Sequence, residues 1–274
     1  MLDSKLAALL EEGLVSSNLA YEGKGKKLYR LSENLLEALL NPGVNIYADE
    51  VLLCVFKDDL TAFNAQKRSS QEGKGGLNCR ISTEIFRLIE AAGLSTHYLP
   101  LRDGLAVELP HFMLCRKLEI ILIEVVVRNV AAGSLVKRLG IKEKTWLKDT
   151  RLGGALVEFY YKNDELGDPI ITDSHCLAMD LASLEELEVL RRKALKINNL
   201  LSDYFDKAGL LLVDFKLEFG RSDGKILLGD EISPDSCRLW DKSTGKKMDK
   251  DRFREDLGDL GNAYKEVLNR ISRI

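Results

Sequence analysis

Apolar and charged residues alternate through the stretch VDFKLEFG, which spans residues 213–220. Because successive side chains of a β-strand point to opposite faces, this pattern predicts a strand with one apolar and one charged face. The apolar face would hold Val213, Phe215, Leu217 and Phe219, and the charged face Asp214, Lys216 and Glu218. An ordinary buried hairpin would not carry such a row of charges, so we expect the chemistry here.

A returning strand is predicted at residues 226–228, after the turn signal Ser222-Asp223-Gly224. A two-residue turn would send Asp230 to the face opposite Glu218 and exclude a metal pair there. An odd-numbered loop or one bulge would place both carboxylates on one face. We predict the odd connection, because Mg²⁺ favours one or two carboxylates completed by substrate phosphates. Alternatively, Lys216 and Glu218 are only exposed cross-strand partners.

Helical and strand-like spacings both occur along the rest of the chain. Strands are predicted around a glycine turn at 18–30, at 50–56 and 156–161, and twice within 106–130, the second passing through 120–127. Helices are predicted at 3–12, 79–92, 135–140, from the capping box at 183–186 to about 207, and as one or two helices in 252–274. The buried stripe of the long helix would be Leu187, Leu190, Ala194, Ile197, Leu201 and Tyr204. The length favours two lobes that meet within 106–130.

The glycine turn reads Gly23-Lys24-Gly25-Lys26-Lys27. Glycines let the backbone turn tightly and approach a ligand, and the lysines supply positive charge, which suits a lid over phosphates. Alternatively, the lysines only discourage edge pairing at a solvated hairpin tip, which is the more common situation for so short a pattern. The P-loop motif GxxxxGK[ST] is absent from the sequence.

Two loops are predicted after the strand at 50–56. The first begins with Asp58-Asp59, and loops that follow buried strands often carry function. The second, from Gln66 to Asn78, is polar, glycine-rich and without periodicity. This composition predicts a mobile loop near the site. A plain surface connection is nearly as consistent with the same composition.

Polar residues interrupt and follow the apolar strand at 120–127. Glu124 lies inside this run, where a buried acid needs a partner unless it faces water at an edge. Beyond Arg128, the small-residue turn 131–134 opens a short helix with Ser134 as its predicted N-cap. Backbone NH groups at such a start can hold a phosphate, and Arg128 would strengthen that site. An ordinary capped turn is the alternative.

The composition argues against several classes of function. The net charge of −3, from 40 Lys and Arg against 43 Asp and Glu, gives no basic field for nucleic acid, so small-molecule partners are expected. The 3 histidines are scattered and HExxH is absent, which argues against zinc hydrolysis or a Cys-His nucleophile. The 5 dispersed cysteines, without a CxxC pair, suggest reduced packing residues. No apolar run approaches the ~20 residues of a membrane span, so a soluble cytoplasmic protein is expected.

Several longer motifs occur along nearly the whole chain. They are YEGKGKKLY, KDDLTAFNA, EVVVRNVAAGSLVKRLG, VDFKLEFG, GDEISPDSCRLWD and DKDRFREDLG. In this order they resemble the phosphoribosylaminoimidazole-succinocarboxamide synthases, the SAICAR synthetase family of purine biosynthesis. The resemblance implies an α+β fold with a small β-rich N-terminal lobe (1–122), a larger α+β lobe (123–274) and an ATP cleft between them. It also implies a homodimer.

The resemblance further implies a role for each candidate site residue. ATP phosphates would contact Lys24, Gly25 and Lys26, and the adenine pocket would be lined by the strand 120–126, with Glu124 and Val126. The ribonucleotide would contact Arg128, Ser134, Lys216, Asp235, Arg238 and Arg254. Mg²⁺ would be held by Glu218 and Asp230, and the catalytic set would be Lys216, Asp59 and Arg238. Asn78-Cys79 stands where the family commonly has paired asparagines, which puts any role of Cys79 in doubt.

The implied reaction joins the carboxylate of carboxyaminoimidazole ribonucleotide to the amine of L-aspartate, while ATP becomes ADP and phosphate. A carboxylate is a poor acyl donor, so an acyl phosphate would form first and the amine would then displace phosphate. Both steps gather negative charge, so catalysis would rest on positioning and on Mg²⁺, lysine and arginine, without a protein nucleophile. An ATP-dependent small-molecule kinase and a nucleotide-binding regulatory module are the alternatives.

Overall fold

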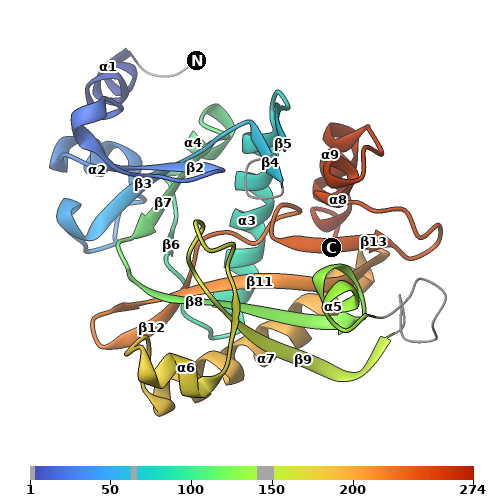
Figure 1. Ribbon diagram of the computed structural model, residues 1–274. Coiled ribbons are helices and arrows are strands. Elements are labelled where there is room, and N and C mark those ends of the chain that lie inside the picture. The colour runs from blue at the N-terminus through green and yellow to red at the C-terminus, as the bar shows by residue number, and fades with distance from the viewer. Residues whose placement is uncertain (1–3, 63–66, 141–150) are drawn as a thin grey trace.

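The computed structural model describes residues 4–62, 67–140 and 151–274. Two larger antiparallel sheets and the helices around them form this part of the chain, so the fold is mixed α+β as predicted (Figure 1). The predicted helix start at Asp3 and the predicted loop start at Gln66 lie outside the described residues. None of the helices in the described ranges is long and apolar enough to cross a membrane.

The first sheet has five strands in the order β1-β2-β3-β7-β6. They are β1 (Leu19–Glu22), β2 (Lys26–Arg30), β3 (Val51–Phe56), β7 (Phe112–Arg116) and β6 (Tyr98–Leu99). Successive side chains of β3 point to opposite faces of the sheet, so two neighbouring residues show which helices cover each face. Leu53 packs with α1 (Ser4–Gly13) and α2 (Glu33–Leu39), whereas Cys54 packs with α3 (Lys74–Ala91). The predicted hairpin around the glycine turn is confirmed as β1 and β2.

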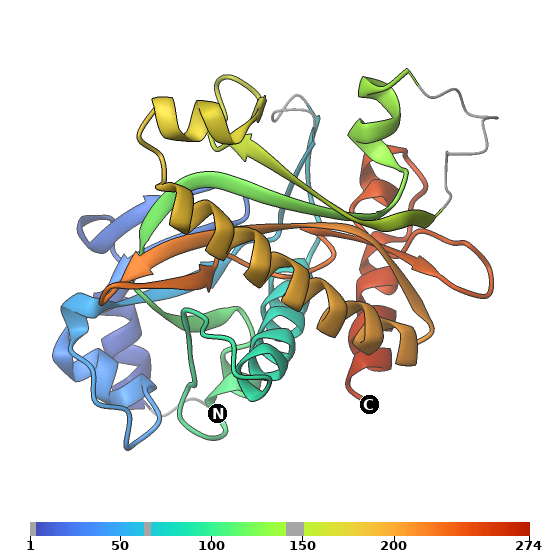
Figure 2. The same ribbon diagram turned by 90° about the horizontal axis from the view of Figure 1, so that it is seen from below.

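The second sheet has six strands in the order β10-β9-β8-β11-β12, with β13 also paired to β11. They are β10 (Ile170–Ile171), β9 (Arg151–Tyr161), β8 (Glu119–Val130), β11 (Leu210–Ser222), β12 (Lys225–Gly229) and β13 (Cys237–Asp241). Helix α7 (Leu184–Lys207) lies along one face of this sheet and begins at the predicted capping box (Figure 2). Its last buried residue is Phe205 rather than the predicted Tyr204, whose hydroxyl donates to the Ile271 carbonyl (3.1 Å).

The remaining elements are short, and they include three corrections. They are η1 (Ser16–Asn18), η2 (Ala48–Glu50), β4 (Asp59–Ala62), β5 (Lys67–Ser70), α4 (Leu105–Glu108), α5 (Gly133–Arg138), α6 (Asp173–Ala178), α8 (Asp251–Arg254) and α9 (Leu260–Ile271). One correction is that Asp59 begins a strand where the sequence predicts a loop. The loop predicted up to Asn78 is wrong, because β5 and the first turn of α3 occupy much of it. Asp58 starts that helix by accepting hydrogen bonds from the Gly73 and Gly75 NH groups. Residues 105–108 form a helical turn after the left-handed Gly104, not a strand.

The β11–β12 hairpin has a two-residue turn that pairs Glu218 with Gly229, so the predicted odd connection is wrong. Asp223 (φ 49°) and Gly224 (φ 68°) are both left-handed, which is the turn geometry that best matches the twist of paired strands. However, β12 ends at Gly229, and Asp230 itself has φ 60°. Strict alternation therefore does not determine where the Asp230 side chain points. The predicted exclusion of the metal pair by a two-residue turn assumes that Asp230 continues the strand, so it does not follow here.

The two predicted faces of β11 are present, with one exception. Phe215, Leu217 and Phe219 belong to the main hydrophobic core. Val213 instead packs in a small separate cluster with Val130, because a bulge between Leu212 and Asp214 shifts the strand register.

A short segment after α3 ties the two sheets together. The His97 NH donates to the Leu228 carbonyl of β12 (2.8 Å), and the Arg116 NH of β7 donates to the His97 carbonyl (2.7 Å). The glycine hairpin of the first sheet also reaches the second, because Lys26 forms an ion pair with Asp230. Side chains from both sheets therefore meet at the charged face of β11.

Candidate active site

Three lysines and three carboxylates meet beside the charged face of β11. This lysine cluster consists of Lys26, Lys162, Lys216, Glu124, Glu218 and Asp230. The pairing of β11 with β8 brings the cluster's central residues together, because Glu218 of β11 lies directly opposite Glu124 of β8. Lys216 Nζ lies 2.7 Å from Glu124 Oε1 and 3.0 Å from Glu218 Oε1. Glu124 therefore has the partner that a buried acid needs, and its interpretation as a water-facing edge residue is wrong.

Two ammonium groups share one oxygen of Glu218. Lys162 Nζ lies 2.8 Å from Glu218 Oε1, the same atom that Lys216 contacts. Burial alone would lower the pKa of both lysines, but Glu218 and its neighbours outweigh burial and raise the pKa of each. Both lysines therefore stay charged and concentrate positive charge at this point.

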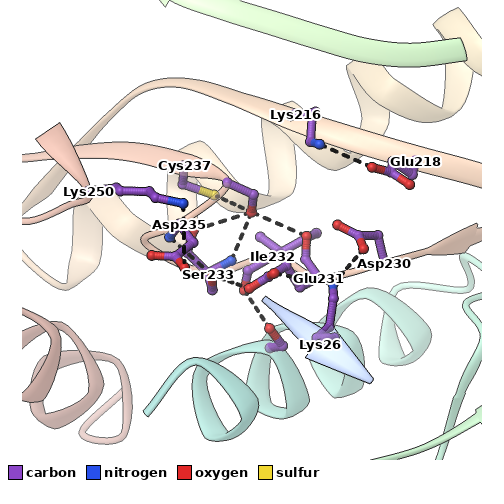
Figure 3. Close-up of polar contacts among 12 residues, drawn as sticks. Lys26, Lys216, Glu218, Asp230, Glu231, Ile232, Ser233, Asp235, Cys237 and Lys250 are labelled. Carbon is purple, nitrogen blue, oxygen red and sulfur yellow. Dashed lines mark hydrogen bonds and ion pairs between the residues drawn. The ribbon is translucent and has the colours of Figure 1, made fainter. Parts of the chain in front are cut away.

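The glycine hairpin brings Lys26 to the same site from the first sheet (Figure 3). Lys26 Nζ lies 2.5 Å from Asp230 Oδ1 and 3.2 Å from Glu231 Oε1. Burial would raise the pKa of Asp230, but Lys26 and Lys216 outweigh burial and hold that pKa well below its usual range. Asp230 is therefore an ionised carboxylate that faces several cations.

Two predicted site residues make other contacts. Lys24, at the hairpin tip, pairs with Asp164 at 2.8 Å. Asp59 pairs with Lys57 at 2.7 Å and is half-exposed. The hairpin is tied to that strand end, because the Lys57 NH donates to the Gly25 carbonyl (2.8 Å). The structure therefore does not place Lys24 or Asp59 within the lysine cluster.

Each predicted metal ligand keeps one oxygen available. The lysines occupy Glu218 Oε1 and Asp230 Oδ1, and within the described part of the chain no donor contacts Oε2 of Glu218 or Oδ2 of Asp230. Among residues 4–62, 67–140 and 151–274, no group of three or more His, Cys, Asp or Glu could hold a metal unaided. Two carboxylates that need substrate phosphates to complete the coordination fit Mg²⁺ and do not fit a structural zinc site.

A second group of charges, which we call the arginine cluster, also involves the charged face of β11. It consists of Arg128, Arg238, Arg254, Glu158, Asp214 and Asp251. Arg128 is buried and donates to Glu158 (2.8 Å), Asp214 (2.9 Å) and the Ser134 hydroxyl (3.0 Å). Ser134 is therefore a partner of Arg128. Its predicted role as N-cap is wrong, because Ala132 holds that position and no side chain caps α5.

Arg238 extends the arginine cluster towards the C-terminus. It donates to Asp214 (2.9 Å) and to Asp251 (2.7 Å), and Asp251 also binds Arg254. Gly133 (φ 58°) permits this arrangement, because a Cβ at that position would lie 2.6 Å from the Arg238 guanidinium. Three arginines predicted to bind the ribonucleotide are thus brought together from separate segments of the chain.

Asp235 lies in a buried group with Lys74, Lys250 and Tyr264, part of which appears in Figure 3. Its carboxylate lies 2.8 Å from Lys74 Nζ, 2.6 Å from the Tyr264 hydroxyl and 3.8 Å from Lys250 Nζ. Burial would raise the pKa of Asp235, but Lys250 and Lys74 hold it well below its usual range. Because Lys74 belongs to α3 and Tyr264 to α9, Asp235 also fixes how these helices meet.

Six residues of these groups are not among the sequence predictions: Lys162, Glu158, Lys74, Asp251, Lys250 and Tyr264. Alternation along the strand predicted at 156–161 could have found the first two, because positions 158, 160 and 162 share one face. Lys74 gives no such signal, since it lies in a glycine-rich stretch that is typical of a loop. Only the packing of α3 shows that it is buried.

Cys79 is a packing residue. Its Sγ contacts the Phe112 carbonyl (3.3 Å), and burial raises the pKa of the thiol to about 12. A buried, protonated thiol is a poor nucleophile, so this environment does not suit Cys79 to nucleophilic catalysis.

Comparison with known proteins identifies the family. The family model described as SAICAR synthetase matches residues 43–271. The phosphoribosylaminoimidazole-succinocarboxamide synthase of Wolinella succinogenes is 53% identical over 257 residues, which cover 93% of this chain and 98% of that protein. A structure of SAICAR synthetase (Type-2) in complex with ADP aligns with a TM-score of 0.79 and 43% identity, covering 93% of this chain and 97% of that one. The synthase structure from Ehrlichia chaffeensis aligns with a TM-score of 0.80 and 40% identity, covering 93% and 99%. The chain therefore belongs to the SAICAR synthetase family.

Proposed function

We propose that the chain is an ATP-dependent ligase of purine biosynthesis. It joins carboxyaminoimidazole ribonucleotide to L-aspartate and yields the succinocarboxamide ribonucleotide SAICAR, ADP and phosphate. Family membership supports the reaction. In the structure, the main support is the Lys216 ammonium between Glu124 and Glu218. Because a lysine ammonium is a mobile point charge, Lys216 can move from these carboxylates to anionic substrate groups.

ATP phosphates would lie under the glycine hairpin. Lys26 already reaches the lysine cluster, the Gly25 backbone holds the turn, and Lys24 lies at its exposed tip. The related enzyme solved in complex with ADP supports a nucleotide site in this fold. Phosphates that enter here would replace carboxylates as partners of Lys26 and Lys24.

The adenine ring would lie against β8. Glu124 and Val126 share a strand face with Ile120 and Leu122, because these positions are two residues apart. Ile120 and Leu122 are large apolar side chains that remain exposed on this face. Apolar surface beside a few polar groups is typical of sites that bind an aromatic base.

The ribonucleotide would bind at the arginine cluster. Arginine suits this task because its planar fork matches phosphate and carboxylate oxygens with paired hydrogen bonds. The residues proposed to contact it are Arg128, Ser134, Lys216, Asp235, Arg238 and Arg254. Their existing partners, such as Asp214 for Arg128 and Arg238, hold the guanidinium groups in place before substrate arrives.

The reaction would proceed in two steps. A carboxylate oxygen of the ribonucleotide attacks the γ-phosphorus of ATP, and the bond to ADP breaks. The amine of aspartate then attacks the acyl carbon, phosphate leaves, and the nitrogen releases a proton. Lys216 and Arg238 offset the negative charge that gathers in both steps, and Asp59 is the further residue proposed near the reacting groups.

Glu218 and Asp230 would hold Mg²⁺ when it is bound. Their available oxygens support this assignment, and the ion would screen the charge of the ATP phosphates. The lysines that now contact these carboxylates would turn towards the phosphates in the same event.

We also propose a nucleotide-binding lobe at residues 1–122 and a substrate- and metal-binding lobe at 123–274, with ATP in a cleft between them. The sheets support a division near this point, because the first sheet includes β7, which ends at Arg116, and β8 of the second begins at Glu119. By family likeness the protein would be a cytoplasmic homodimer. Light scattering after gel filtration tests the assembly, and a monomer would contradict it.

The reaction itself can be tested directly. With ATP, Mg²⁺ and the carboxylated ribonucleotide present, we expect ADP release and amide formation to depend on L-aspartate. A kinase would release ADP and a phosphorylated ribonucleotide without aspartate. A regulatory module would bind nucleotide without turnover. Either result would refute the proposed function.

A further inference from the structure

Lys67, the first residue of β5, reaches across to the C-terminal part of the chain. Its Nζ donates to the Phe253 carbonyl (2.6 Å) and to Asp256 Oδ1 (2.6 Å). The same ammonium lies 4.7 Å from the centre of the Phe253 ring, within the range of a cation–π contact. One lysine thus makes three contacts with the turn that includes α8.

These contacts surround Arg254. Phe253 precedes it in α8, and Asp256 follows two residues later with left-handed backbone (φ 55°). A helix of four residues has little hydrogen bonding of its own to fix its position. The direction of the Arg254 side chain therefore depends on what holds this turn in place.

Several contacts hold the turn. The Lys250 NH donates to the Pro234 carbonyl (3.0 Å), and the Arg252 side chain donates to the Lys247 carbonyl (3.1 Å) and to the Gly258 carbonyl (2.7 Å). Asp251, at the start of α8, binds both Arg238 and Arg254 and so fixes one end to the arginine cluster. Lys67 fixes the other end to β5, an element from the first third of the chain. Among these contacts, those of Lys67 hold the residues on either side of Arg254 against β5, so Lys67 contributes to the orientation of Arg254.

We propose that Lys67 is a positioning residue for the ribonucleotide, acting through α8 to aim Arg254 at the substrate phosphate. The proposal rests on the proposed role of Arg254 in binding the ribonucleotide. Lys67 itself does not touch the substrate. Its ammonium is already occupied by a carbonyl and a carboxylate, and its effect passes through the backbone on either side of Arg254.

The test compares steady-state kinetics of Lys67→Met, Arg254→Met and the double variant. We expect Lys67→Met to raise KM for the ribonucleotide about tenfold, the loss expected when one contact to a charged ligand is misaligned. kcat and the KM values for ATP and L-aspartate should stay within about twofold. Because Lys67 acts through Arg254, adding Lys67→Met to Arg254→Met should change nothing further.

Two variants serve as controls. Lys67→Arg keeps a cation that can bond to the same carbonyl and carboxylate, so it should restore most of the lost affinity. Lys242→Met removes an exposed ion pair with Asp206 of α7, and it should leave all three KM values unchanged.

The kinetics of these variants separate the role of Lys67 from that of Arg254. If Arg254→Met leaves KM for the ribonucleotide unchanged, the assignment of Arg254 within the proposed function is wrong. If Arg254→Met raises that KM but Lys67→Met does not, the positioning role of Lys67 is wrong. Additive effects in the double variant would mean that Lys67 acts independently of Arg254, which also overturns the proposal. Equal changes in all three KM values, with a lower melting temperature, would show a purely structural role.

Discussion

The lysine cluster and the arginine cluster share the charged face of one strand, yet they are built differently. Lys216 and Lys162 contact the same oxygen of Glu218, and their side chains are 32% and 30% exposed. Arg128 is 3% exposed and distributes its guanidinium over Glu158, Asp214 and Ser134. The partly exposed lysines share one buried acceptor, whereas the arginine has a separate acceptor for each part of its fork.

This difference suits two tasks on one sheet. A lysine is a flexible point charge that can exchange one anion for another, as the transfer of a phosphoryl group requires. A buried arginine with several fixed partners is already oriented and loses little freedom when a substrate binds. We therefore assign the chemical steps mainly to the lysine cluster, together with Arg238, and the holding of the ribonucleotide mainly to the arginine cluster.

The largest effect is expected from Glu218→Gln in the lysine cluster. Loss of this charge removes a proposed Mg²⁺ ligand and the acceptor of two lysines, so kcat should fall on the order of 100- to 1000-fold. The free energy of unfolding should change by less than about 1 kcal/mol, because both lysines can turn to water. Glu119→Gln, an exposed residue of the same sheet, is the matched control for stability and kcat. A loss of stability that matches the loss of activity would favour a structural role.

Asp214→Asn in the arginine cluster should mainly reduce stability, whereas Glu218→Gln should mainly reduce kcat. It removes a carboxylate shared by Arg128 and Arg238 and leaves a buried guanidinium only partly compensated. We expect a loss of about 3 kcal/mol in the free energy of unfolding, measured with urea. Asp173→Asn breaks the more exposed pair with Arg191 and should cost less than about 1 kcal/mol. Similar losses in both variants would contradict a special role for the buried cluster.

The free energy of unfolding should also depend on pH, with opposite signs for a residue beside each cluster. The first of these residues is Asp249, which lies beside the arginine cluster. Burial and the neighbouring Asp251 raise the pKa of Asp249 to about 7. A carboxyl group with a raised pKa contributes stability below its unfolded value of about 4, and this contribution is lost as pH rises towards 7. From about pH 5 to 8 the free energy of unfolding should lose roughly 2 kcal/mol through this residue. Asp249→Asn should remove that slope, and an unchanged slope would exclude Asp249 as its source.

The second residue is His97, which lies beside the lysine cluster. Through His97 the free energy of unfolding should fall as the pH falls, by a smaller amount. Burial, and then Lys26, lower the pKa of His97 to about 4. A histidine with a lowered pKa leaves stability intact above about pH 6.5 and reduces it as pH falls towards 4. Between about pH 7.5 and 5.5 the expected loss is roughly 1 kcal/mol, and His97→Phe should not show it. If His97→Phe lost the same stability between about pH 7.5 and 5.5, the assignment of this loss to His97 would be contradicted.

Much of the lysine cluster could be predicted from the sequence because it lies on regular strands. Alternation alone places Lys216 and Glu218 on one face, and the apolar run around Glu124 indicates an acid that needs a partner unless it faces water. Alternation failed at Asp230, because a left-handed residue beyond the strand end does not follow the period of two. The turn itself was mispredicted, although Asp223-Gly224 is a typical sequence for a two-residue turn.

The arginine cluster could not be predicted in this way. Its arginines stand at positions 128, 238 and 254, and no local period connects them, so only the resemblance to a family grouped them. Their carboxylate partners depend on strand register and on the packing of α8, which form only in the folded chain. Lys67 and Lys74 were hidden for the same reason, because the polar segment that contains them gives no helical or strand-like pattern.

The most direct test of this division is a steady-state comparison of Lys216→Met with Arg254→Lys, with the ribonucleotide as the varied substrate. We predict that Lys216→Met lowers kcat at least about 100-fold with little change in KM. Arg254→Lys should raise KM about tenfold while kcat stays near that of the unmodified enzyme, because a lysine keeps the charge but not the fork. If both variants changed the same kinetic constant, the assignment of separate tasks to the two clusters would be contradicted.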